Sequence, residues 1–186
     1  VMRHRRVLDW IEARPDLDAG RIGVFGASLG GFNALYLAAL DDRVRAVVPA
    51  LVAGDLPYVM THSNERRIVE AVEGAKAALS MTSEELRVYL DRKLETDLLA
   101  LAPHVDPSRV LMVIAKRDKA VPYEKQVELR EALGSPAAIY LPTGHVTTAA
   151  YIFYLRSRSR RFFEDSLTEA GDSVSLLPVA RCAAGP

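Results

Sequence analysis

The serine at position 28 lies between glycines, in Gly26-Ala27-Ser28-Leu29-Gly30, where the short apolar run 22–25 gives way to a second apolar run. A serine hydroxyl at its ordinary pKa is a weak nucleophile and needs a base within hydrogen-bond reach. A tight turn from a strand into a helix exposes the hydroxyl, and the flanking glycines leave room for neighbouring backbone. The motif therefore predicts a nucleophilic Ser28. We expect side chains at positions 26 and 30 to collide with the adjoining strand and helix.

A nucleophilic serine needs a histidine as its base. The chain has four histidines, at positions 4, 62, 104 and 145. Only His145 follows a predicted strand, in "AIYLPTGH", and the carboxyl ends of strands are where α/β sheets place reactive groups. We therefore predict His145 as the base; the alternative is a histidine that caps a helix or faces solvent.

A carboxylate is also needed to orient the histidine. Asp118 comes directly after the apolar run 110–115, and Asp55 follows the run 44–48 as the competing candidate. We favour Asp118, because Ser28, Asp118 and His145 then follow one another in a known order of nucleophile, acid and base. An ordinary turn aspartate is the alternative for Asp118.

The elements that must position these residues are read from the apolar pattern. Four short runs, 22–25, 44–48, 110–115 and 138–141, are nearly continuously apolar, as in strands covered on both faces. Helical segments separate them, and residues 3–13 form an apolar helical stripe through Val7, Leu8, Trp10 and Ile11. The pattern predicts an α/β fold with a parallel sheet flanked by helices.

Residues 54–103 form an insertion too long for a simple crossover. One amphipathic helix carries apolar residues at 68, 72, 75 and 79. A second begins with a capping box of Thr82 and Glu85 and continues through Leu98. We predict a single core domain of residues 1–53 and 104–170, a helical cap of residues 54–103, and a flexible tail of residues 171–186.

Three segments resemble the α/β-hydrolase superfamily, in its dienelactone-hydrolase, acetyl-esterase and prolyl-oligopeptidase-like branch. They are "LDWIEARPDLDAGRIGVFGASLGG", "SRVLMVIAKRDKAVP" and "YLPTGHVTTA". The resemblance implies that Ser28 is the nucleophile, His145 the general base and then acid, and Asp118 its orienting carboxylate. It also implies that the backbone N–H of Leu29 donates to the oxyanion.

Members of that superfamily have several strands before the nucleophile turn, and a loop after one of them supplies the second oxyanion donor. Before Ile22 this sequence predicts only a helix. We therefore expect the N-terminal part of the sheet to be missing and the first strand to keep an open edge, which favours pairing with another chain. A fragment of a longer protein, or a homo-oligomer that completes its sheet, would account for this.

Composition excludes some partners. The chain has 24 basic and 24 acidic residues and no formal net charge, which gives no general attraction to nucleic acid or anionic membranes. We expect no segment that spans a membrane. The single cysteine, Cys182, leads us to expect the cytoplasm. The sequence shows no metal-ligand motif, and we expect neither a metal nor an organic cofactor.

The predicted function is a serine hydrolase that cleaves small carboxylic esters through an acyl-enzyme intermediate. Peptidase, thioesterase and lactone hydrolysis are alternatives within the same chemistry. A different alternative is a hydrolase-like binding or assembly module without turnover, because half of the oxyanion hole is expected to be missing.

Overall fold

A computed structural model describes residues 2–94 and 96–174. Its centre is a four-stranded, all-parallel sheet in the order β1-β2-β3-β4. The strands are β1 (Ile22–Ala27), β2 (Val44–Ala50), β3 (Leu111–Ala115) and β4 (Ala137–Leu141). Because the strands follow chain order and run in one direction, all their carboxyl ends meet at one edge of the sheet. The predicted α/β fold with a parallel sheet is confirmed.

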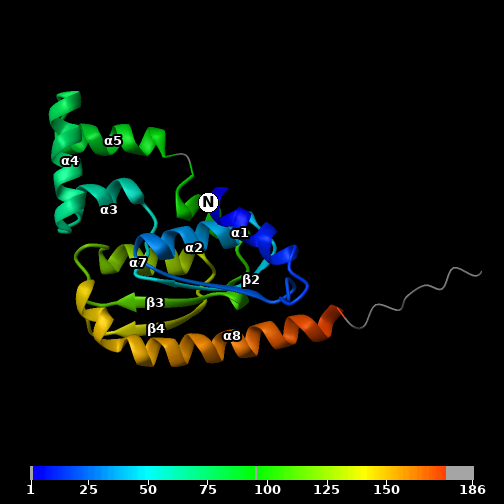
Figure 1. The fold of residues 1–186 in the computed structure, drawn as a ribbon. Helices are drawn as coiled ribbons and strands as arrows, with labels where there is room; N and C mark the ends of the chain where they lie inside the picture. Colours follow the sequence, from blue (N-terminus) through cyan, green and yellow to red (C-terminus); the bar gives the residue numbers. More distant parts are fainter. Residues whose placement is uncertain (1, 95, 175–186) are drawn as a thin grey trace, which may run out of the picture.

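Helices cover both faces of this sheet (Figure 1). Helices α1 (Met2–Glu12), α2 (Leu29–Leu40) and α7 (Tyr123–Ala132) lie on one face, and α8 (Ile152–Val174) lies on the other. The larger apolar core, which includes Leu35 and Met112, fills the first side. A smaller core packs Val113 against Leu155 of α8.

Burial differs between the central and the edge strands. Every residue of β3 is buried, and β2 has only one residue that is not. The edge strands are less covered: Phe25 of β1 is 44% exposed and Tyr140 of β4 is 39% exposed. The prediction that all four strands are covered on both faces is therefore right for β2 and β3 and wrong for β1 and β4.

Residues 54–103 are helical, as predicted, and stand off the sheet beyond α2 and α7 (Figure 1). They form α3 (Leu56–His62), α4 (Arg66–Leu79), α5 (Ser83–Lys93) and α6 (Leu98–Leu101), followed by the single turns η1 (Ala102–His104) and η2 (Pro107–Arg109). The predicted capping box of Thr82 and Glu85 is present at the start of α5. The prediction that this helix continues through Leu98 is wrong. Asp97 accepts a hydrogen bond from Leu99 N and thereby begins a separate helix, α6.

Helix α3 is fastened to α7 by an ion pair. Lys125 Nζ lies 2.7 Å from Asp55 Oδ2, and both side chains are less than one-fifth exposed. The same ammonium group lies 4.7 Å from the ring centroid of Tyr58, whose ring stacks on His62. These contacts fix the first helix of the insertion beside the helix that follows Asp118.

The two ends of the described chain depart from prediction. In α1 only Leu8 is buried, whereas Val7 and Trp10 are both more than half exposed, so the expected stripe is narrow. Helix α8 extends through Val174, so residues 171–174 are helical and do not belong to a tail. The rest of the predicted tail lies outside the described residues. None of the helices in the described part of the chain is long and apolar enough to cross a membrane.

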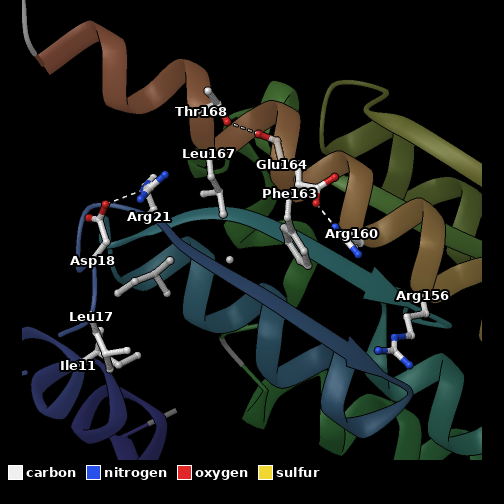
Figure 2. A pocket seen from close by; sticks show the side chains of 12 residues that line it. Ile11, Leu17, Asp18, Arg21, Arg156, Arg160, Phe163, Glu164, Leu167 and Thr168 are labelled. Atoms are coloured by element: carbon white, nitrogen blue, oxygen red, sulfur yellow. Dashed lines mark hydrogen bonds and ion pairs between the residues drawn. The ribbon is translucent and has the colours of Figure 1, made fainter.

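Within residues 2–94 and 96–174, no strand pairs with the outer edge of β1. A groove of about 790 Å³ runs along this edge between α1 and α8. Figure 2 shows the apolar side chains of Ile11, Leu17 and Phe163 around it and the side chain of Arg156 at one end. The open edge predicted for the first strand is therefore present.

Candidate active site

Ser28 occupies the sharp turn between β1 and α2. Its backbone has φ 52° and ψ −126°, in a region that non-glycine residues rarely adopt. The Ser28 N–H donates to the carbonyl of Ala50 in the neighbouring strand at 2.8 Å, which holds the turn against the sheet. Backbone strain of this kind persists only where the surrounding structure enforces it, and it is concentrated at functional sites.

Glycine is required at this turn, but not at both expected positions. A Cβ on Gly26 would overlap the backbone carbonyl of Gly30, so the prediction for Gly26 is confirmed. A Cβ on Gly30 would meet nothing within 4 Å, so the predicted collision there is wrong. The second tight position is Gly31, where a Cβ would lie 2.6 Å from Val52 Cγ1 and 2.8 Å from the carbonyl oxygen of Ala50. Helix α2 therefore lies close to the end of β2 at Gly31.

The fold brings Ser28, His145 and Asp118 into one chain of hydrogen bonds. Ser28 Oγ lies 2.9 Å from His145 Nε2, and His145 Nδ1 lies 2.7 Å from Asp118 Oδ2. An ionised carboxylate can only accept, so the N–H of the neutral imidazole is at Nδ1 and points to Asp118. The Nε2 lone pair is then directed at the serine hydroxyl, which is the arrangement that a general base needs.

The Asp118 carboxylate is held on both oxygens and its side chain is fully buried. Its Oδ1 accepts hydrogen bonds from the backbone N–H groups of Ala120 (2.9 Å) and Val121 (3.0 Å). Its Oδ2 accepts from His145 and lies 3.4 Å from Gln126 Nε2. A buried charge is costly unless hydrogen bonds replace its lost hydration, and this carboxylate accepts them on both oxygens.

Gln126 is a site residue that the sequence analysis missed. It is fully buried in α7, accepts a hydrogen bond from Ala115 N (3.3 Å) and donates to the carbonyl of Val121 (2.7 Å). One signal could have revealed it. Gln126 shares the buried face of its helix with Leu129, at a spacing of three residues, and a polar residue on an apolar face needs specific partners.

Threonines shape the loop that carries His145. Thr143 Oγ1 and Thr148 Oγ1 lie 2.8 Å apart in the interior, and the Thr148 hydroxyl donates to the carbonyl of Gly144. The Gly144 N–H in turn donates to Thr147 Oγ1 at 2.9 Å. The short helix η3 (Val146–Tyr151) begins directly after His145. These bonds fix the loop from both sides and so set the direction of the imidazole.

The competing residues lie in other surroundings. Asp55 begins α3, where its side chain accepts from Tyr58 N and pairs with Lys125. Burial opposes ionisation of Asp55, but the hydrogen bonds from Lys125 and Tyr58 outweigh it and hold the pKa of this carboxyl below its usual range. His4 lies on α1, His62 stacks on Tyr58, and His104 ends η1, so only His145 is hydrogen-bonded to Ser28.

Leu29 is the first residue of α2, and its backbone N–H lies in the first turn of that helix. N–H groups in a first helical turn have no acceptor within the helix, so they are free to stabilise a negative charge. Among the residues that the structure describes, no group of three or more His, Cys, Asp or Glu side chains could hold a metal ion.

Comparison with known sequences identifies the family. Residues 4–133, more than half of the chain, match the X-Pro dipeptidyl-peptidase (S15) family. A segment of 41 residues is 46% identical to the putative hydrolase YtaP of Bacillus subtilis and covers 22% of this chain and 14% of that protein.

Solved structures agree with this assignment. An acetyl xylan esterase from Paenibacillus sp. R4 is 27% identical, with a TM-score of 0.71 over 87% of this chain, and this chain spans only 50% of the esterase. The α/β hydrolase GrgF from Penicillium sp. sh18 has the same fold, with 18% identity, a TM-score of 0.65, and coverage of 89% of this chain and 71% of that one. The chain therefore belongs to the X-Pro dipeptidyl-peptidase (S15) family, within the α/β-hydrolase superfamily.

Proposed function

We propose that the protein is a serine hydrolase that cleaves carboxylic esters, with Ser28 as nucleophile, His145 as base and then acid, and Asp118 as the orienting carboxylate. The observation that carries this proposal is the hydrogen-bonded chain from Ser28 Oγ through His145 to Asp118. A serine hydroxyl becomes reactive when a neighbouring base removes its proton. Membership of a hydrolase family supports the same assignment.

In the proposed reaction, Ser28 Oγ attacks the ester carbonyl while its proton passes to His145 Nε2. The C–O bond to the alcohol then breaks as the imidazolium returns this proton to the leaving oxygen, which leaves an acyl group on Ser28. Water then attacks the acyl carbonyl and gives a proton to the same imidazole. The bond from the carbonyl carbon to Ser28 Oγ breaks, the imidazolium returns the proton to Ser28, and the acid is released. Asp118 keeps the imidazole in the tautomer that both steps need and stabilises the imidazolium.

The oxyanion formed at the carbonyl needs hydrogen-bond donors. The Leu29 N–H, next to Ser28 at the start of α2, is the proposed first donor. Loss of one such donor typically lowers kcat by about 100- to 1,000-fold. Turnover by this chain alone should therefore be slow if a second donor comes from outside the described residues.

Two substrate classes are distinguished by different observations. Similarity to the acetyl xylan esterase, at 27% identity, supports esters with short acyl groups as substrates of this chain. The match to the X-Pro dipeptidyl-peptidase family supports peptides with proline in the second position as substrates. Comparison of kcat/KM for p-nitrophenyl acetate with that for a dipeptide Ala-Pro p-nitroanilide separates the two classes, and we expect the ester to be the better substrate.

The experiment that tests the proposal is intact-mass measurement after brief exposure to a fluorophosphonate, which reacts with activated serines. We expect one adduct in the natural chain and none in Ser28→Ala. An unlabelled but folded protein would contradict the proposed function and favour a binding or assembly module.

Location in the cytoplasm rests on the single cysteine, Cys182, and stays a prediction.

A further inference from the structure

A hollow of about 400 Å³ lies beside His145, between the start of α4 and the two loops that follow β3 and β4. Backbone hydrogen bonds fix its walls. Asn64 N donates to the carbonyl of Lys119 at 3.1 Å, and Arg117 N donates to the carbonyl of Thr143 at 2.9 Å. The fold itself therefore defines the hollow, because hydrogen bonds join the backbone of the segments around it.

The hollow is strongly basic. Arg66, Arg117 and Lys119 line it, and Glu65 is the one acidic residue that does. Glu65 is already engaged, since its carboxylate accepts a hydrogen bond from Ile68 N at the start of α4. This carboxylate also satisfies the helix end, so the end of α4 adds little attraction for another anion.

Two of the three cations have no acidic partner within the part of the chain that the structure describes. Arg66 pairs with Glu70 on the surface of α4 at 3.1 Å. Among the ion pairs of the described residues, none includes Arg117 or Lys119. Both side chains are exposed at the hollow. The Asp118 carboxylate, which is hydrogen-bonded to His145, is fully buried, so the solvent-exposed charges of Arg117 and Lys119 are the ones that a ligand in the hollow would meet.

The proposed reaction decides which part of a substrate lies near this charge. His145 Nε2 faces Ser28 and must return its proton to the leaving oxygen of the alcohol. The alcohol portion of the ester therefore lies over the imidazole, and the same residue forms a wall of the hollow. Ser28 itself does not line the hollow, so a substituent on the alcohol must extend past the imidazole to reach Arg117 and Lys119.

We propose that this hollow binds an anionic group, a carboxylate or phosphate, on the alcohol portion of the substrate. The enzyme then prefers esters whose alcohol portion carries such a group. The inference rests on the proposed hydrolase function. The cations are exposed, so their attraction acts through a solvent of high dielectric and is sensitive to salt. A moderate preference follows, expressed mainly in KM and kcat/KM.

The test compares two esters of equal size, 3-acetoxybenzoate and 3-acetoxybenzamide, which share the acetyl group and differ in the charge on the phenol. We expect Arg117→Gln combined with Lys119→Gln to lower kcat/KM for the benzoate about 3- to 10-fold and to change that for the benzamide less than about twofold. Raising NaCl to 0.5 M should likewise lower the ratio of kcat/KM for the benzoate to kcat/KM for the benzamide in the natural enzyme.

Lys116→Gln is the matched control. Lys116 is a neighbouring exposed cation that lies 5.7 Å from the ring centroid of Tyr140 and does not line the hollow. The control should keep the natural preference. An equal loss in Lys116→Gln would assign the effect to overall charge, and an unchanged preference in the double variant would show that the hollow does not bind the carboxylate. Either outcome would overturn the proposal.

A binding measurement separates this proposal from the proposed function. Ser28→Ala cannot form an acyl-enzyme, so its affinity for intact 3-acetoxybenzoate is measured by NMR titration, with and without the two glutamine substitutions. Salt-sensitive binding that these substitutions weaken, without turnover by the natural chain, would support the hollow and contradict the hydrolase. Equal turnover of both esters at all salt concentrations would support the hydrolase and contradict the hollow.

Discussion

The Gln126 side-chain amide lies 3.4 Å from Asp118 Oδ2, the carboxylate oxygen that also accepts from His145 Nδ1. Gln126 is fully buried, and its other hydrogen bonds tie it to the end of β3 and to the turn after Asp118. It is thus a positioning residue, which acts on the imidazole through the carboxylate.

We expect Gln126→Met, which keeps the size and removes the donor, to lower kcat about 3- to 30-fold with little change in KM. Without this donor the carboxylate is held less firmly and orients the imidazole less well, which lowers kcat. The Asp118 charge is also shared with one donor fewer and stabilises the imidazolium more strongly. The acidic limb of the pH–rate profile should therefore move to higher pH. The measurement is kcat and KM for an ester between pH 5 and 9.

Leu129→Val is the control for Gln126→Met, because Leu129 is equally buried on the same face of α7 and makes none of the hydrogen bonds to the Asp118 carboxylate. It should lower stability without moving the pH profile. A profile that stays in place in Gln126→Met would assign Gln126 a purely structural role.

Substitutions in the proposed triad should separate Asp118 from Asp55. Ser28→Ala and His145→Ala should each abolish ester hydrolysis, and Asp118→Asn should lower kcat by about 10,000-fold, because the imidazole would lose its orienting acceptor. Asp55→Asn should change kcat less than about threefold, since this carboxylate pairs with Lys125 rather than His145. Steady-state kinetics of the four variants test this, and comparable losses in Asp55→Asn and Asp118→Asn would refute the assignment of the acid.

The two glycines around the nucleophile turn should respond differently to alanine. Gly26→Ala should destabilise the fold by about 3 kcal/mol or more, because its Cβ would overlap backbone that cannot move aside. Gly30→Ala should cost less than about 1 kcal/mol, since its Cβ would meet open space and alanine favours the helix. Urea unfolding of both variants measures the difference, and equal destabilisation would contradict the geometry of the turn.

Asp41 should make stability depend on pH. Its side chain is only 4% exposed and accepts from Arg43 and Arg5, and the Arg43 hydrogen bonds, more than those of Arg5, hold the pKa of this carboxyl well below its usual range. A lowered pKa in the folded state stabilises the protein above the unfolded pKa of about 3.9, and this stabilisation is lost as the pH falls below it.

Asp41→Asn should therefore lower the free energy of unfolding by about 1.5–3 kcal/mol at pH 7. The difference from the natural chain should shrink as the pH falls below about 4, where the Asp41 carboxyl takes up a proton in the unfolded chain but stays ionised in the folded one. Thermal unfolding of both proteins between pH 3 and 7 is the measurement. A difference that stays constant over this range would contradict the role of the Asp41 charge.

Local sequence was sufficient for much of the fold. The apolar runs predicted the four strands to within a few residues. A strand buried between helices needs an apolar side chain at nearly every position, which holds for β2 and β3. Gly26, two residues before Ser28, predicted the turn, since only a residue without Cβ fits against the carbonyl of Gly30. The capping box of Thr82 and Glu85 involves residues three apart and was equally readable.

Sequence predicted less well where a distant contact decides the outcome. The separate start of α6 depends on Asp97, which accepts hydrogen bonds from the backbone of residues 55 and 56 as well as from Leu99 N. The need for glycine at position 31 comes from the Val52 side chain beside β2, which no local pattern contains. The role of the buried Gln126 side chain likewise depends on its contacts with the turn that holds Asp118.

The sequence by itself determined the residue types, the strained turn at Ser28 and the order in which Ser28, Asp118 and His145 follow the strands. The tertiary structure alone placed Asp118, and not Asp55, at hydrogen-bond distance from His145, and gathered Arg117 and Lys119 around a hollow beside it. The physical reason is the distance along the chain over which each effect acts. Backbone conformation and apolar periodicity act between neighbours along the chain, whereas Ser28 and His145 are 117 residues apart and meet only because parallel strands bring their carboxyl ends to one edge of the sheet.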